Sequence, residues 1–191
     1  FDLALSAVTG GAVETVADEI RETDRQINAT EVEIRRALLV HASVHGGIDT
    51  PEVLAFMNMI KDLERIGDYN KNIFDLAEEG VSFTESPEID SILSLRDEVS
   101  SRISLMGEIL SVRDEERART YIERGDELRK DFDRRVNELL HSTEAAVTAV
   151  PKALLFRFLK RVSAHSSNVV SAVVMPVDQL DYFDESEDTR L

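Results

Sequence analysis

The sequence predicts an all-α protein built as two tandem three-helix bundles, and three observations support this fold class. Apolar residues recur at intervals of three and four along most of the chain, as at Ile20, Ile27, Ile34 and Leu38. No alternating apolar run is long enough to indicate a sheet. The chain also repeats itself weakly, which indicates two copies of one helical unit.

The predicted helices follow one another with short connections, so we expect antiparallel neighbours. Thr50-Pro51-Glu52 and Ser86-Pro87-Glu88 each fit an N-cap, a proline at the first helical position and an acidic first turn. Pro151 is expected to open the last helix. We predict long helices over 12–45, 51–79, 88–112, 114–142 and 151–175.

The internal repeat appears when the sequence is laid over itself. Residues 20–38 overlie 122–140 after a shift of 102 positions, and residues 63–73 overlie 159–169 after a shift of 96. The first shift places residues 1–10 on the end of a helix. We therefore expect the first bundle to lack most of its first helix. The chain begins at Phe1 without a methionine, which fits a processed or excised piece.

These observations predict a division of the chain into four parts. The expected parts are a first repeat over 1–80, a linker over 81–87, a second repeat over 88–180 and an acidic, mobile tail over 181–191.

Composition excludes several classes of function. The chain has 191 residues, no cysteine and a net charge of −16, so thiolate sites are excluded and nucleic acid is not an expected partner. No apolar run approaches the length of a membrane-spanning helix. An acidic, lysine-poor surface is typical of proteins from a high-salt cytoplasm. Codon bias in an ordinary acidic protein is the alternative, and both explanations stay open.

Two rows of oxygen-bearing side chains are the candidate site. Residues four apart on a helix lie about 40° apart around its axis, so they form one stripe. The first row is Glu64, Asp68 and Asn72, and the second, on the preceding helix, is Asp24, Asn28 and Glu31. If the two helices pack antiparallel, both rows can bind a cation between them, and iron, zinc, manganese or magnesium would suit the oxygen ligands.

Spacing alone leaves an alternative open. The carboxylates could be solvated and paired with neighbouring bases such as Lys61, Arg35 or Arg65. Gly67 costs the helix roughly 1 kcal/mol relative to alanine. It is best explained if another helix or a ligand approaches closely at that position.

The segment DLERIGDYNKNI (62–73) and the partner segment DRQINATEVEIRR (24–36) carry a family resemblance. The chain resembles the PhoU-like phosphate-regulatory proteins, which have a Glu/Asp-x-x-x-Asp motif on the last helix of each of two three-helix bundles. The resemblance implies a multinuclear metal site, with iron or zinc typical, on the two rows.

The resemblance also implies a regulatory role and no enzymatic reaction. We therefore expect a cytoplasmic adaptor in phosphate uptake or phosphate signalling, peripheral to the membrane at most. The expected partners are a membrane transporter, a sensor histidine kinase and a second copy of the chain in a homodimer.

The second repeat departs from the family pattern. Lys160 and Ala164 replace the two carboxylates of the first row, and Lys130 replaces an amide of the other row, while Asp126 and Asp133 remain. We hypothesise that the two ammonium groups replace the metal and neutralise the two aspartates. Decay of an unneeded site is the alternative, and both predict no metal cluster in this repeat.

Two rival functions are kept. One is a metal-free helical dimerisation or regulatory module of another transporter or channel. The other is a di-iron bundle enzyme, because Glu138 and His141 have the Glu-x-x-His spacing of such proteins. All histidines, His165 included, are expected at helix ends or on the surface. Phe156 and its apolar neighbours are expected in the core, with a docking face as the alternative.

Overall fold

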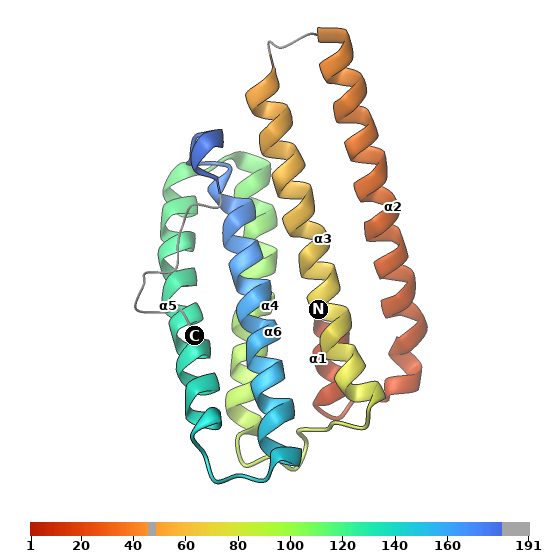
Figure 1. The fold of residues 1–191 in the computed structure, drawn as a ribbon, viewed down its shortest axis with the longest axis vertical. Helices are drawn as coiled ribbons and strands as arrows, with labels where there is room; N and C mark the ends of the chain where they lie inside the picture. The colour runs from red at the N-terminus through yellow and green to blue at the C-terminus, as the bar shows by residue number, and fades with distance from the viewer. Residues whose placement is uncertain (46–48, 181–191) are drawn as a thin grey trace.

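The computed structural model describes residues 1–45 and 49–180, and these ranges are helical, without a strand. Figure 1 shows the arrangement. This confirms the predicted all-α class. The elements are α1 (Asp2–Val8), α2 (Val13–His45), α3 (Thr50–Glu78), α4 (Ile89–Val112), α5 (Glu115–Leu140), α6 (Ala146–Ser171) and a 3₁₀ turn η1 (Val177–Gln179).

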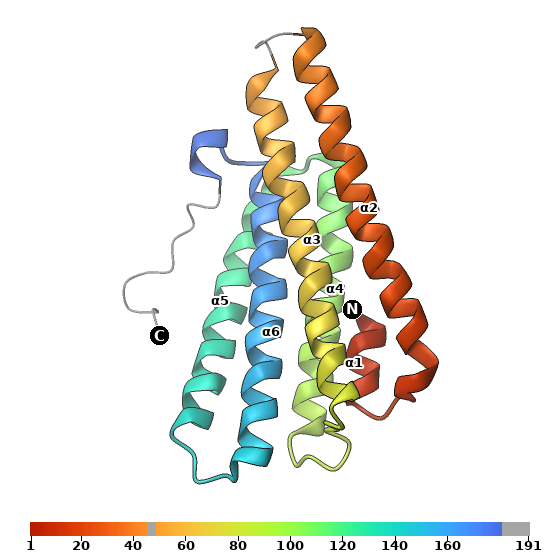
Figure 2. The same ribbon diagram turned by 45° about the vertical axis from the view of Figure 1, so that its right-hand side comes forward.

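The helices form two units, which we call repeat 1 (α1–α3) and repeat 2 (α4–α6). Helix α3 packs against α2 on one side and against α6 on the other, and α6 packs in turn against α4 and α5. Consecutive long helices run antiparallel, as predicted. Helix α1 is short. It packs against α2 and α3, at the end of this helix pair where α2 begins and α3 ends (Figure 2).

One apolar core joins the repeats. Ile73 and Phe74 of α3 and Phe156 and Leu159 of α6 are at most 2 % exposed, and burying such a side chain stabilises the fold by about 1.5–3 kcal/mol. The core placement of Phe156 is therefore confirmed.

One predicted helix start is wrong, and so is one predicted proline position. Helix α6 begins at Ala146, so Pro151 lies inside it. Proline there removes one hydrogen bond to the carbonyl of Val147, but the alanine-rich start favours the helix enough to tolerate this loss. Helix α4 begins at Ile89, one residue after the predicted start, so Pro87 lies in the turn before the helix, where Ser86 Oγ accepts a hydrogen bond from the Glu88 amide at 3.2 Å.

Residues 46–48 and the predicted mobile tail lie outside the described residues. The division into repeats, linker and tail by residue number stays a prediction. Over the described ranges, no helix combines the length and the apolar character needed to cross a bilayer.

Candidate cation site between α2 and α3

The antiparallel register of α2 and α3 brings the predicted carboxylates to one seam. Lys71 Nζ lies 3.6 Å from Asp24 Oδ2 across the seam. Glu31 is seven residues further along α2, and Glu64 is seven residues back along α3, so the two glutamates are opposed. Both line the same groove.

This groove has a volume of about 400 Å³. Among the described residues, Glu31 and Glu64 are the only charged ones that line it, and a smaller pocket of about 70 Å³ that contains Asp24 and Lys71 adjoins it. Most of the remaining lining of the groove is apolar and comes from α2, α3 and α4, namely Ile27, Ile34, Ile60, Leu63, Ile66, Ile103 and Met106.

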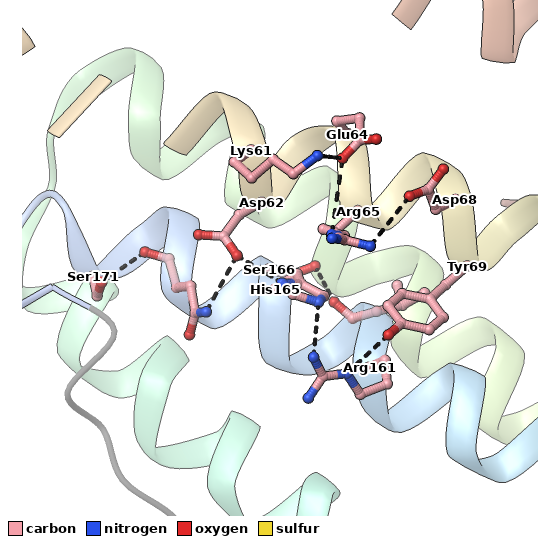
Figure 3. Close-up of polar contacts among 12 residues, drawn as sticks. Lys61, Asp62, Glu64, Arg65, Asp68, Tyr69, Arg161, His165, Ser166 and Ser171 are labelled. Atoms are coloured by element: carbon pink, nitrogen blue, oxygen red, sulfur yellow. Dashed lines mark hydrogen bonds and ion pairs between the residues drawn. The ribbon is translucent and has the colours of Figure 1, made fainter. Parts of the chain in front are cut away.

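Every predicted carboxylate also lies beside a basic side chain, and Figure 3 shows the contacts of Glu64 and Asp68. The pairs are Glu64–Lys61 at 2.6 Å, Asp68–Arg65 at 3.6 Å, Glu31–Arg35 at 2.8 Å and Asp24–Lys71 at 3.6 Å. In the part of the chain that the structure describes, no three acidic or histidine side chains are placed to hold a metal ion together. In this conformation, the bases therefore neutralise the carboxylates.

Three observations show that the donor chemistry nevertheless suits a cation. The side chains of Glu31 and Glu64 are each only 13 % exposed, so their charges are poorly solvated. Glu31 Oε1 and Asn70 Oδ1 are buried and accept no hydrogen bond from any described residue. The contact between Arg35 and Glu31 is an ion pair without hydrogen-bond geometry. Burial and the neighbouring Glu64 carboxylate raise the pKa of Asp68.

The predicted amides lie away from the groove. Asn28 is exposed and Asn72 is half-buried, and neither lines the groove or its smaller neighbour. Asn70, which the sequence analysis missed, lines both. It is six residues from Glu64, so the four-residue spacing that defined the row could not find it.

Gly67 lies where α2 approaches α3 closely, as its position within the helix predicted. A Cβ atom on Gly67 would lie 3.1 Å from Ile27 Cδ1 of α2. The neighbour is therefore a helix, and the absence of a side chain lets α2 pack close to α3.

The opposite face of α3 carries a polar cluster that joins the repeats (Figure 3). His165 Nδ1 lies 2.6 Å from Asp62 Oδ1, which also accepts Asn168 Nδ2 at 3.2 Å. Arg161 Nε donates to the Tyr69 hydroxyl at 3.2 Å, and the Tyr69 and His165 rings stack 5.7 Å apart.

The expectation that His165 lies at a helix end or on the surface is wrong, because it is 8 % exposed. Its partner comes from a helix about a hundred residues earlier, so no local pattern indicates the contact. Tyr69 and His165 occupy equivalent positions under the shift of 96. The two repeats therefore meet through matching positions of α3 and α6.

In repeat 2, one of the two hypothesised lysine contacts forms. Lys160 Nζ donates to both carboxylate oxygens of Asp133 at 2.7 Å. Lys130 is exposed, and Asp126 pairs with Arg129 instead. The prediction for Lys130 is wrong because an arginine one position earlier is turned toward the aspartate.

Residues 1–77 match the family model described as "PhoU domain", and this range contains both carboxylate rows. Over these residues the chain is similar to a PhoU domain. Its structure is similar to the crystal structure of PhoU from Pseudomonas aeruginosa, with a TM-score of 0.73 and 19 % sequence identity over 91 % of this chain and 86 % of that one. At this identity the likeness shows a shared fold. No curated protein sequence matches this chain.

Proposed function

We propose that this PhoU-like protein is a non-enzymatic regulator of phosphate uptake or phosphate signalling. The match of residues 1–77 to the PhoU domain carries the proposal. The similarity of the whole fold to a solved PhoU structure supports it.

The cation site of the proposed regulator is the α2–α3 seam. Glu31 and Glu64 would hold the ion, with Asp68, four residues along α3, and Asp24, seven residues back along α2, as further ligands. Asn28 and Asn72 stay in the proposed ligand set as outer donors. Iron or zinc is the proposed metal, and manganese or magnesium would suit the same oxygen ligands. A bound ion would neutralise the opposed glutamates and free Lys61 and Arg35 from that role.

The proposed partners are a membrane transporter, a sensor histidine kinase and a second copy of the chain. Exposed apolar side chains on α2 and α3 support docking, because large apolar patches mark interaction sites. Their exposed fractions run from 37 to 72 %, at Val32, Ile34, Leu39, Val40, Val44, Leu54, Phe56 and Leu63. We place this regulator in the cytoplasm, peripheral to the membrane at most.

The metal-free module remains the second candidate, because each carboxylate of the site already has a basic neighbour. The di-iron enzyme has less support. Glu138 and His141 are exposed near the end of α5, and Glu138 pairs with Arg134 at 2.6 Å. Di-iron ligands project instead into the bundle interior.

Phosphate uptake in cells tests the proposal. A strain without the protein would be complemented with the wild type, with Glu64→Ala/Asp68→Ala or with the exposed control Glu33→Ala, and the rate of labelled phosphate uptake measured in phosphate-rich medium. We expect the control to restore regulated uptake and the double variant to fail. Equal regulation by both variants would favour the metal-free module, and unchanged uptake without the protein would refute the phosphate role.

A further inference from the structure

The two repeats share one helix register, which allows their seams to be compared position by position. Glu31 overlies Asp133 under the shift of 102, and Glu64 overlies Lys160 under the shift of 96. In repeat 1 the two glutamates line one groove. In repeat 2 the equivalent residues form a direct ion pair at 2.7 Å.

The ion pair of repeat 2 is buried. The Lys160 side chain is 5 % exposed and that of Asp133 is 17 % exposed. A buried ammonium group is strongly unfavourable unless a carboxylate compensates it, and here both oxygens of Asp133 accept from Nζ. An aspartate in this position likewise needs a cation nearby.

At the neighbouring level of the seam each repeat has a base beside its aspartate, Lys71 in repeat 1 and Arg129 in repeat 2. Asp24 of repeat 1 overlies Asp126, and Lys71 overlies Ser167. Arg129 contacts both repeat-2 residues, pairing with Asp126 and donating to Ser167 Oγ at 3.1 Å. Repeat 2 thus supplies a positive charge from its own side chains at both levels.

We infer that Lys160 is a built-in counter-ion that takes the place of a bound cation in repeat 2, so that any response of the protein to metal resides in repeat 1. The metal ligands that the fold family implies do not fit the α5–α6 seam, because Lys160 stands where repeat 1 has Glu64 and its ammonium group already contacts both carboxylate oxygens of Asp133. The claim about metal response in repeat 1 rests on the proposed function, whereas the claim about Lys160 does not.

The first experiment measures thermal unfolding of the full chain in EDTA. Lys160→Met should lower the Tm by roughly 10 °C, because it leaves Asp133 buried without its ammonium partner. Adding Asp133→Asn should recover at least half of the loss. Lys130→Met, which removes an exposed lysine from α5, is the control and should leave the Tm unchanged. A Lys160→Met protein as stable as this control would overturn the inference.

The second experiment measures the Tm with MnCl₂ in variants that give one repeat the charge arrangement of the other, either two opposed carboxylates or a carboxylate opposite a lysine. Lys160→Glu gives repeat 2 an opposed pair of carboxylates, so we expect a Tm that is low in EDTA and rises by about 5–10 °C with manganese. Lys160→Met, which offers no second carboxylate, should rise by no more than the wild type does. Equal responses of the two variants would overturn the inference. A response of Lys160→Glu alone, with none in the wild type, would support it while refuting the metal site of repeat 1.

A third variant gives repeat 1 the arrangement of repeat 2, and it keeps the inference testable if Lys160→Glu does not fold. Glu64→Lys places an ammonium group opposite Glu31, so its Tm in EDTA should be at least that of the wild type and should not respond to manganese. Glu33→Lys makes the same charge change at an exposed position of α2 and is the control. If Glu64→Lys lowers the Tm more than Glu33→Lys does, a lysine cannot serve as counter-ion in this register and the inference fails.

Discussion

Asp62 and Glu64 are two positions apart on α3 and have different neighbours. Asp62 faces α6 and is 7 % exposed, and its Oδ1 contacts both His165 and Asn168. Glu64 lines the groove toward α2. One helix therefore carries the contact between the repeats on one face and the candidate cation site on another.

The buried Asp62 contact gives a direct prediction for stability. Asp62→Ala should lower the free energy of unfolding by about 1–3 kcal/mol, because it leaves the buried His165 and the half-buried Asn168 without the carboxylate that they contact. Asp97→Ala is the control, since Asp97 pairs with Arg96 in solvent. Urea unfolding would measure both variants, and equal values would show that the cluster does not hold the repeats together.

Asp68 gives a prediction about pH. Burial and Glu64 raise its pKa in the folded protein above the usual value of 3.8. The folded state therefore disfavours the ionised form, and this cost is present above the raised pKa and disappears below about 3.8. In EDTA, Asp68→Asn should be slightly more stable than the wild type near neutral pH, with the difference shrinking as the pH falls.

Urea unfolding from about pH 7 to about pH 4 would follow this difference. The same series with MnCl₂ should reverse its sign, because the wild type alone keeps the full carboxylate set. A variant that is less stable than the wild type in EDTA at every pH would contradict the account.

At the scale of elements, the sequence predicted most of the fold. The apolar spacing that contains Ile20, Ile27 and Ile34 gave α2 within a residue of its observed start, and Pro51 marked the start of α3. The start of α6 was predicted wrongly at Pro151, because proline is common at the first position of a helix. The alanine-rich residues before it are also helical. Local signals of this kind set helix boundaries only where packing does not override them.

The part of the site that depends on spacing along a single helix could be predicted from the sequence. Glu31 and Glu64 were found because spacing along a helix fixes the face that a residue occupies. Asn70 and the Asp62–His165 contact were not found, since they depend on how α2 and α6 pack against α3. The pairing of Asp126 with Arg129 depends on a side-chain rotamer, which residue spacing does not specify.

Three helical glycines test the packing between elements. A Cβ atom added at Gly107 would meet no atom of a neighbouring described element within 4 Å, so Gly107→Ala should stabilise the protein by up to about 1 kcal/mol. Gly67→Ala should be close to neutral, since the flexible end of Ile27 can yield. Gly125→Ala should destabilise, because its Cβ would come within 2.5 Å of Ser167 Oγ and 2.7 Å of Arg102 Nη2. Urea unfolding checks this order, and a stabilised Gly125→Ala would contradict the packing of α5 on α6.

At the scale of the whole molecule, a net charge of −16 acts against compactness. Salt screens this repulsion, since the Debye length falls to about 3 Å at 1 M. The Tm should therefore rise as KCl increases from about 0.1 M to about 1 M. A falling Tm would show that the surface ion pairs, such as Arg117–Glu108, matter more than the overall repulsion.

The two repeats share a fold and a helix register but differ in how each seam is neutralised. Repeat 1 opposes Glu31 to Glu64, and repeat 2 opposes Asp133 to Lys160. This asymmetry would make repeat 1 the responsive part of the regulator and repeat 2 a fixed support. The Asp62–His165 contact would then join the responsive seam to that support through α3.

The central claim is a cation site on repeat 1, and metal content tests it most directly. Protein purified without an affinity tag or chelator would be measured by inductively coupled plasma mass spectrometry, with the wild type beside Glu64→Ala/Asp68→Ala. We predict stoichiometric iron, zinc or manganese in the wild type and its loss in the double variant. Equal metal in both proteins, or metal in neither, would contradict the claim.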